Sequence, residues 1–338
     1  MPIRRTTQVY ERVDRDLFLG TIKPAARPAI LKGLVGDWPA TRAGRTAPAT
    51  LADYLRPLAA ATPAPYFEGM DPAERRFAYT ANLDGFNFER KRAPAGEILD
   101  RLLALVDAPA APGLYAGALN TAHYFPAFSK DNGLCGLIDA SPVLESIWIG
   151  NDTVIAPHYD NTENIACVVA GRRRFTLFPI AQYPNMYVGP LDFTPAGQPI
   201  SLVDTRNPDF SAFPRFREAL EAAEVAELDA GDAIYIPTLW WHGVESLTSF
   251  GMLVNYWWRD VPGHFGACMN ALLFGALSLK DLPTAQRQSW KAVFDYLIFQ
   301  TDGPPLAHLP ASAQGIFGDL TEENAARIRA FLAQNLNR

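Results

Sequence analysis

The chain has 338 residues, of which 49% are hydrophobic and 20% are charged, a balance typical of a folded globular protein rather than a disordered one. The formal net charge is −6 and lysine and arginine form no long run, which argues against nucleic acid as a partner. No segment is long and apolar enough to cross a bilayer, and the N-terminus has no apolar signal core, so no membrane partner is expected.

The N-terminal part of the chain is predicted to be an α/β elaboration with many loops. Proline is scattered through residues 23–65. The Ala/Thr/Pro bias of 40–65 indicates a surface excursion that contains a short helix around 50–59. No repeat of fixed period is visible, which excludes solenoids and propellers.

The middle of the chain is predicted to be rich in strands. Short segments of β-branched and aromatic residues alternate there with glycine and proline turn signals, and one helix is expected at 213–223. Several short strands with few helices between them favour a barrel or sandwich, so the expected fold class is mainly β with flanking helices. The predicted strands are 144–149, 163–169, 172–178, 233–237 and 251–258.

The C-terminal segment, 263–338, is predicted to be a helical extension. Apolar residues follow a helical spacing from Trp290 to Ile298, and again from Ile328 to Leu336. Thr321, followed by two glutamates, is typical of a helix start. The two apolar stripes fit either packing on the β core or a homodimer interface, and the sequence does not decide between these.

His158, Asp160 and His242 are the strongest candidates for chemistry. Residues i and i+2 of a strand point to the same face, so His158 and Asp160 can enter one cavity. A second imidazole from a later strand would complete two histidines and one carboxylate on one side of a metal. This set leaves the other side open, as in non-heme Fe(II) oxygenases. A hydrogen-bonded His–Asp pair at a strand end is the structural alternative.

The cysteines are widely spaced and include no Cys-x-x-Cys pair. Cys135, Cys167 and Cys268 are therefore typical of reduced thiols, and we expect a cytoplasmic protein. Three further histidines have no ligand-like neighbours and are expected to be structural or exposed. They are His123, His264 and His308.

Five motifs follow the same order as in one known family. They are Ala156–Asn164, Gly171–Pro179, Gly231–Pro237, Trp240–His242 and Asn255–Trp257. In order and spacing they resemble the jumonji-C-like cupins of the factor-inhibiting-HIF type, and Arg27–Leu31 with Asp37–Pro39 resembles the N-terminal signature of that group. The resemblance covers about residues 20–260. It implies a double-stranded β-helix (jelly-roll or cupin) core in a domain at 1–262.

The resemblance also implies an oxygenase that uses Fe(II) and 2-oxoglutarate, with His158, Asp160 and His242 as the iron ligands. The family places a lysine fifteen residues after the first histidine to bind the far carboxylate of 2-oxoglutarate, and Arg173 has that position here. The other residues that match cosubstrate-binding positions are Tyr115, which would bind the same carboxylate, and Asn164, Asn255 and Trp257 near the metal.

Two positions depart from the family pattern. Ile155 replaces a threonine that touches the cosubstrate, and Thr153 and Thr176 are the candidate substitutes. Arg173 keeps the charge of the family lysine, but a planar guanidinium is not interchangeable with an ammonium group. Its two arginine neighbours have the opposite strand parity and are expected to face away. These departures leave open a shifted cosubstrate pose or a different 2-oxoacid.

The function expected first is hydroxylation of an amino-acid side chain in a protein, a peptide or a free amino acid. N-demethylation and RNA-base hydroxylation would use the same site, although the acidic charge is less favourable for RNA. A non-catalytic cupin that binds a metal or small ligand is the alternative from another class. Specificity is expected in loops around the barrel mouth, at 66–90, 120–135 and 180–210.

Overall fold

The computed structural model describes residues 3, 5–72, 75–108, 111–134 and 136–336. The chain divides into two compact units, Met1–Arg259 and Asp260–Arg338, close to the predicted boundary after residue 262. Within the described residues, no helix combines the length and the apolar composition that a membrane span requires.

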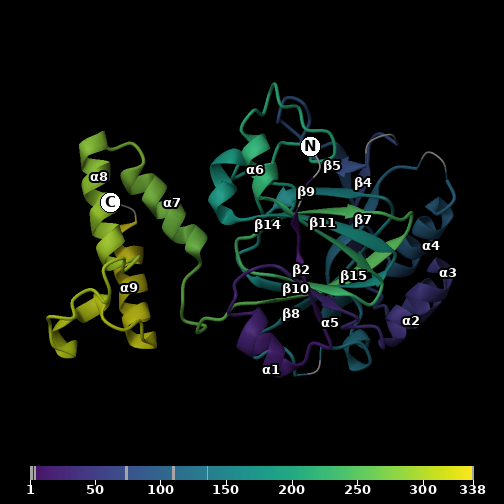
Figure 1. Ribbon diagram of the computed structural model, residues 1–338, viewed down its shortest axis with the longest axis horizontal. Coiled ribbons are helices and arrows are strands. Elements are labelled where there is room, and N and C mark those ends of the chain that lie inside the picture. The colour runs from purple at the N-terminus through teal and green to yellow at the C-terminus, as the bar shows by residue number, and fades with distance from the viewer. Residues whose placement is uncertain (1–2, 4, 73–74, 109–110, 135, 337–338) are drawn as a thin grey trace. The chain divides into compact units, whose positions relative to one another are not determined.

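The first unit is built on two facing sheets (Figure 1). The smaller sheet contains, in spatial order, β1 (Arg5–Thr6), β12 (Glu224–Asp229), β11 (Arg172–Phe178), β14 (Trp241–Ser246), β9 (Val154–His158) and β5 (Arg76–Phe77). The larger sheet contains β2 (Gln8–Glu11), β3 (Ala29–Lys32), β13 (Ala233–Ile236), β10 (Glu163–Ala170), β15 (Gly251–Trp258), β8 (Leu144–Gly150), β7 (Leu114–Asn120), β4 (Ala64–Gly69) and β6 (Phe88–Ala93). From β8 to β15 the chain crosses repeatedly between the sheets, as in a jelly roll.

Strand β11 illustrates how the space between the sheets is filled. Alternate residues point to opposite faces of a strand, so Arg173, Phe175 and Leu177 are buried while Arg172 is exposed. Phe175 and Leu177 pack with apolar side chains of β10, β12, β13 and β15 in one cluster. The core of the barrel is therefore apolar except at Arg173 and around the residues described below.

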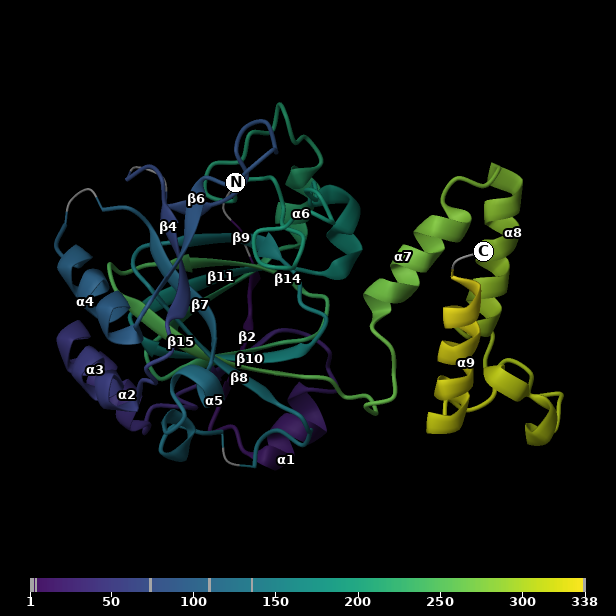
Figure 2. The ribbon, with the colours of Figure 1, turned by 180° about the vertical axis from the view of Figure 1, so that it is seen from behind.

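Helices cover the outer face of the larger sheet (Figure 2). Leu51 and Leu55 of α3 and Ile98 of α4 lie in the same buried cluster as Ile147 and Ile165 of the sheet. Strand β10 is consequently buried on both faces, which explains its nearly continuous apolar sequence. The helices of this unit are α1 (Arg15–Leu17), α2 (Pro39–Thr46), α3 (Pro48–Leu55), α4 (Ala95–Leu105), α5 (Thr121–Tyr124) and α6 (Phe216–Ala222).

The predicted fold class is confirmed, since the unit is mostly β with two large sheets and flanking helices. All five predicted strands correspond to observed ones, and the helix predicted at 213–223 is α6. The helix predicted at 50–59 begins earlier, at Pro48, and ends in a 3-10 turn at Arg56–Leu58. Strands β9, β12 and β14 were not predicted as strands from their composition; β9 contains Pro157, and half of the residues of β12 are acidic.

The second unit contains α7 (Cys268–Leu279), α8 (Thr284–Leu297) and α9 (Glu322–Asn335). Thr321 starts α9 as predicted, because its hydroxyl accepts a hydrogen bond of 3.2 Å from the Asn324 N–H. Among the described residues of this unit Ala325 alone is buried, whereas Leu277 of α7 is 74% exposed. Such exposed apolar helices are typical of an interaction surface. Packing on the β core and homodimer formation both stay predictions.

Of the cysteines, Cys167 is buried and Cys268 exposed, and both are free thiols. Burial raises the pKa of Cys167 well above its usual value, so this thiol stays protonated and unreactive. Cys135 lies outside the described residues.

If the helices of the second unit form a homodimer interface, Leu277→Glu should convert the dimer to a monomer, because an unpaired charge would be buried there. Light scattering during size-exclusion chromatography measures this. Ser278→Glu, at the adjacent exposed residue of α7, is the matched control and should leave the dimer intact. A monomeric unsubstituted chain would contradict the homodimer prediction.

Candidate metal centre

The structure brings the three predicted ligands together. His158 is the last residue of β9 and pairs in register with His242 of β14, which places the two imidazole centroids 4.3 Å apart. One ligand atom from each of His158, Asp160 and His242 lies within 4.8 Å of the others. Asp160 is not on the strand, as the i, i+2 argument assumed, because β9 ends at His158. The turn that follows, in which the Asp160 carbonyl accepts a hydrogen bond from the Leu239 N–H at 2.9 Å, still directs the carboxylate to the imidazoles.

Backbone carbonyls orient both imidazoles. Nδ1 of His158 lies 2.9 Å from the Ala156 carbonyl oxygen, and Nδ1 of His242 lies 3.0 Å from that of Trp240. Because a carbonyl can only accept, each Nδ1 carries the proton and each Nε2 presents a lone pair to the centre of the site. Burial, and then the neighbouring His158, lower the pKa of His242 to about 4, so this imidazole is neutral and able to bind a metal at pH 7.

The Asp160 carboxylate lacks the partners that burial usually demands. Its Oδ2 is buried and has no hydrogen-bond partner within the described part of the chain, while Nε2 of His242 lies 3.6 Å away. A buried carboxylate oxygen left in this way costs free energy unless a cation compensates it. Two imidazoles and one carboxylate suit a divalent first-row metal, so the residues present fit Fe(II).

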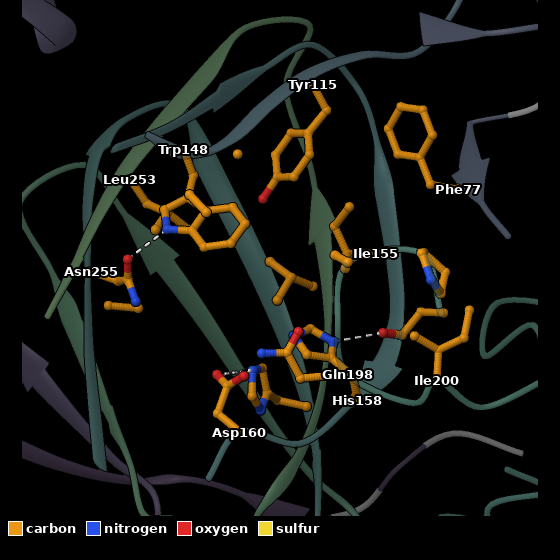
Figure 3. Close-up of a pocket in the computed structure, with 18 of the residues that line it drawn as sticks. Phe77, Tyr115, Trp148, Ile155, His158, Asp160, Gln198, Ile200, Leu253 and Asn255 are labelled. Carbon is orange, nitrogen blue, oxygen red and sulfur yellow. Dashed lines mark hydrogen bonds and ion pairs between the residues drawn. The ribbon is translucent and has the colours of Figure 1, made fainter. Parts of the chain in front are cut away.

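The three ligands lie at one end of an apolar cavity of about 340 Å³ (Figure 3). Among the described residues that line the cavity, Asp160 is the one with a carboxylate, and none is a lysine or an arginine. The walls are mainly aromatic and aliphatic, with Phe77, Trp148 and Leu253 labelled in Figure 3. This is the composition of a small-molecule pocket in which a few polar groups fix orientation.

Tyr115 lies at the other end of the cavity, and buried Arg173 is its electrostatic neighbour. The Tyr115 hydroxyl points into it (Figure 3), and burial raises the pKa of Tyr115 to about 12, so the phenol remains a donor at neutral pH. Tyr115 pairs with Gly150, and Gly150 pairs with Gly251 on the next strand. A Cβ added at Gly150 would lie 2.8 Å from the Tyr115 ring, so only glycine leaves room for the phenol here.

Arg173 is a buried cation without a carboxylate partner among the described residues. It is 1% exposed, and its Nε and Nη2 atoms have no hydrogen-bond partner within the described chain. Burial lowers the pKa of Arg173 while the neighbouring Tyr115 raises it, so the two groups interact electrostatically. Arg173 is not among the described lining residues, but its neighbour Tyr115 is. The predicted outward direction of Arg172 and Arg174 is confirmed, since both pair with Glu227 at the surface.

A row of polar side chains lines the wall between the two ends. Nε1 of Trp148 donates to Oδ1 of Asn255 at 2.6 Å, and Nδ2 of Asn255 donates to Oδ1 of Asn164 at 3.5 Å. Trp257 packs edge-on against Trp148, and its Nε1 is buried without a partner in the described residues. All four side chains line the cavity. An oxygen-rich ligand would find an indole donor and two amides along this wall.

Ile155 lines the cavity as the sequence departure suggested. Neither candidate substitute replaces the missing hydroxyl. Thr153 is buried and donates to the Asn151 carbonyl at 3.4 Å, and Thr176 has the outward parity of β11. Within the described lining residues, neither threonine appears.

Gln198 also lines the cavity, and its amide points toward the ligand triad (Figure 3). Sequence reasoning missed this residue, although it named the loop 180–210 that contains it. The signal that could have found it is a polar residue inside an otherwise apolar and proline-rich loop. The histidines expected to be structural or exposed lie away from the cavity lining. They are His123, His264 and His308.

Comparisons with known proteins agree with this geometry. A family model described as a cupin-like domain matches residues 15–264. The lysine-specific demethylase JMJ31 of Arabidopsis thaliana is 36% identical over 103 residues, which are 30% of this chain and 18% of the relative. The tRNA wybutosine-synthesizing protein 5 of Gallus gallus is 33% identical over 105 residues, 31% of this chain and 30% of the relative. The HSPB1-associated protein 1 of Homo sapiens is 32% identical over 129 residues, 38% of this chain and 26% of the relative.

The matched stretches thus span less than a third of these three relatives. The family model, in contrast, covers most of this chain and contains all three ligand residues. The chain therefore belongs to the cupin-like (jumonji-C) domain family, which uses Fe(II) and 2-oxoglutarate.

Proposed function

We propose that this protein is a 2-oxoglutarate- and Fe(II)-dependent oxygenase that hydroxylates an uncharged amino-acid side chain of a protein, a peptide or a free amino acid. The observation that carries the proposal is one apolar cavity with three metal-ligand side chains at one end and a buried cation beside a phenol at the other. This spacing suits a dicarboxylic 2-oxoacid, which would bind the metal at one end and a cation at the other.

In this proposal His158, Asp160 and His242 hold Fe(II) and leave its opposite side open. Tyr115 donates a hydrogen bond to the far carboxylate of 2-oxoglutarate, and the Arg173 charge beside it balances that carboxylate. Asn164, Asn255 and Trp257 orient the end nearer the metal. The residue roles follow the predicted assignment, and the unpartnered atoms of Arg173, Trp257 and Asp160 support it.

When bound, Fe(II) and 2-oxoglutarate supply the oxidation, in which O2 is reduced, 2-oxoglutarate becomes succinate and CO2, and one oxygen atom enters a C–H bond of the substrate. The protein itself orients the metal ligands and excludes water from the cavity. The carbonyls of Ala156 and Trp240 keep the imidazoles in the ligand tautomer. The apolar wall around Ile155 and Leu253 excludes water from the open side of the metal.

The composition of the cavity favours an uncharged substrate group. Removal of a methyl group from a methylated lysine would bring a cation into the cavity. Aromatic side chains of the wall could face that cation, but Asp160, the carboxylate among the described lining residues, is committed to the metal and would not pair with it. N-demethylation is thus the second choice, supported by the name of the Arabidopsis relative.

An RNA base is a further candidate, because one relative is named as a tRNA wybutosine-synthesizing protein. The net charge of −6 makes it the less favoured substrate. A non-catalytic cupin would not need a complete triad, so the intact set of ligands supports an enzyme.

His158→Ala and Asp160→Ala should each weaken Mn(II) binding by more than about 100-fold, because removing a direct ligand costs more than the 10–100-fold lost with an outer-shell partner. Calorimetric titration of the full chain measures the change. His123→Ala, at an exposed histidine outside the triad, is the matched control. Equal metal affinity in all three variants would refute the ligand assignment.

Arg173→Met should raise the melting temperature of the ligand-free protein, because it replaces an uncompensated buried cation by an apolar side chain, a change worth about 1–4 kcal/mol in comparable cases. The same variant should bind 2-oxoglutarate at least about 10-fold more weakly while keeping its Mn(II) affinity. Arg172→Met, at the exposed neighbour, should change neither quantity much. A variant that binds 2-oxoglutarate normally would remove Arg173 from the proposal.

The Fe(II)-loaded protein should convert 2-oxoglutarate slowly to succinate with equal consumption of O2, even without its substrate. Succinate and O2 can be quantified in one reaction, with Asp160→Ala as the inactive control. A protein that binds both Fe(II) and 2-oxoglutarate but forms no succinate would favour the non-catalytic cupin instead.

A further inference from the structure

One wall of the cavity is formed by residues 190–198, here named the wall segment. Pro195, Ala196 and Gln198 of this segment line the cavity. The segment forms neither helix nor strand. Its C-terminal end is anchored, because Ile200 makes a β-bridge to the metal-ligand residue His158.

Two side chains hold the middle of the wall segment, Tyr79 just after β5 and Arg90 on β6. Tyr79 donates a hydrogen bond of 2.5 Å to the Phe193 carbonyl, and Nη2 of Arg90 donates one of 2.7 Å to the Pro195 carbonyl. Tyr79 and Arg90 also approach the carbonyls of Pro190 and Thr194, at 3.4 Å each. Among the described residues, these two side chains make all the recorded hydrogen bonds from the rest of the chain to 190–198.

An aromatic stack supports the same contacts. The Phe193 ring stacks on Phe86 with centroids 4.7 Å apart, and the guanidinium carbon of Arg90 lies 5.0 Å from the centroid of the same Phe86 ring. Burial raises the pKa of Tyr79, so its hydroxyl remains a donor. Arg90 therefore joins the aromatic residues to the wall segment both through its charge and through its N–H groups.

The backbone then turns sharply to present Gln198. Gly197 has a φ of +97°, which favours glycine, and its N–H donates to Oγ1 of Thr194 at 2.9 Å. This turn lies directly before Gln198, whose amide points toward the ligand triad (Figure 3). The position of the Gln198 amide near the ligand triad thus depends on how the preceding residues are held.

We propose that Tyr79 and Arg90 are positioning residues, which hold the wall segment so that the Gln198 amide contacts whatever group occupies the open side of the metal. The inference rests on the proposed function only in taking His158, Asp160 and His242 as metal ligands. Neither positioning residue needs to touch the substrate or the cosubstrate. Both act through Gln198.

The first test asks whether these contacts hold the wall segment. Tyr79→Phe removes only the hydroxyl, and Arg90→Ala removes the guanidinium. Loss of one such hydrogen bond should raise the equilibrium constant for local opening of the wall segment about 10-fold. Chymotrypsin should therefore cleave after Leu191 or Phe193 about 10-fold faster in both variants. Mass spectrometry identifies the sites. Arg92→Ala, on the same strand as Arg90, is the matched control and should be cleaved at the wild-type rate. Wild-type cleavage of Tyr79→Phe and Arg90→Ala would overturn the proposal.

The second test asks whether they act through Gln198. The visible absorption spectrum of the full chain loaded with Co(II) reports the surroundings of the metal without any turnover. Gln198→Ala, Tyr79→Phe and Arg90→Ala should each shift this spectrum, and the double variant Arg90→Ala/Gln198→Ala should shift it no further than Gln198→Ala alone. Because Tyr79→Phe keeps the ring, a shift there is not a loss of packing.

Additive shifts, or a spectrum unchanged in any of the three single variants, would overturn the proposal. Both readouts remain interpretable if the protein fails to oxidise 2-oxoglutarate, so failure of the proposed function and failure of this inference are distinguishable. Failure of Co(II) to bind the wild-type chain would overturn the metal centre and the inference with it.

Discussion

The antiparallel pairing of β9 with β14 is the constraint on which the rest of the site depends. It places His158 opposite His242, and the carbonyls of Ala156 and Trp240 then set both tautomers. Neither histidine needs a carboxylate to orient it, so Asp160 is left for the metal. A shift of this register by one residue would send one imidazole to the outer face of the sheet. Sheet geometry therefore places the two imidazoles, and the turn after β9 adds the carboxylate of Asp160.

At the opposite end of the cavity, burial of Arg173 lowers the stability of the ligand-free protein. A buried guanidinium without a carboxylate partner in the described residues costs free energy, and Arg173 is 1% exposed with its Nε and Nη2 atoms unpartnered there. Such a cost is expected at a binding site, where the ligand supplies the missing charge. Gly150 is a second feature of this kind, because a larger residue there would add packing but would collide with Tyr115. These features support the proposal that the end of the cavity away from the metal binds an anion.

Much of the fold and the metal centre could be predicted because their signals are local. Strand composition found β8, β10, β11, β13 and β15, and motif spacing found the three ligands. What the sequence could not show is how distant segments meet. Asp160 lies beyond the strand on which it was expected, since the end of β9 is set by pairing with β14. Gln198 lines the cavity from a loop whose carbonyls accept hydrogen bonds from Tyr79 and Arg90, more than a hundred residues earlier in the chain. The substrate depends on such loops, so its identity stays a proposal.

Binding of 2-oxoglutarate to the Mn(II)-loaded chain and to the metal-free chain, compared by calorimetry, tests the account most directly. If the triad and the Tyr115–Arg173 end are two halves of one cosubstrate site, one molecule should bind per chain, and its affinity should fall sharply without the metal. Equal affinity with and without Mn(II), or no binding to either form, would contradict the shared site.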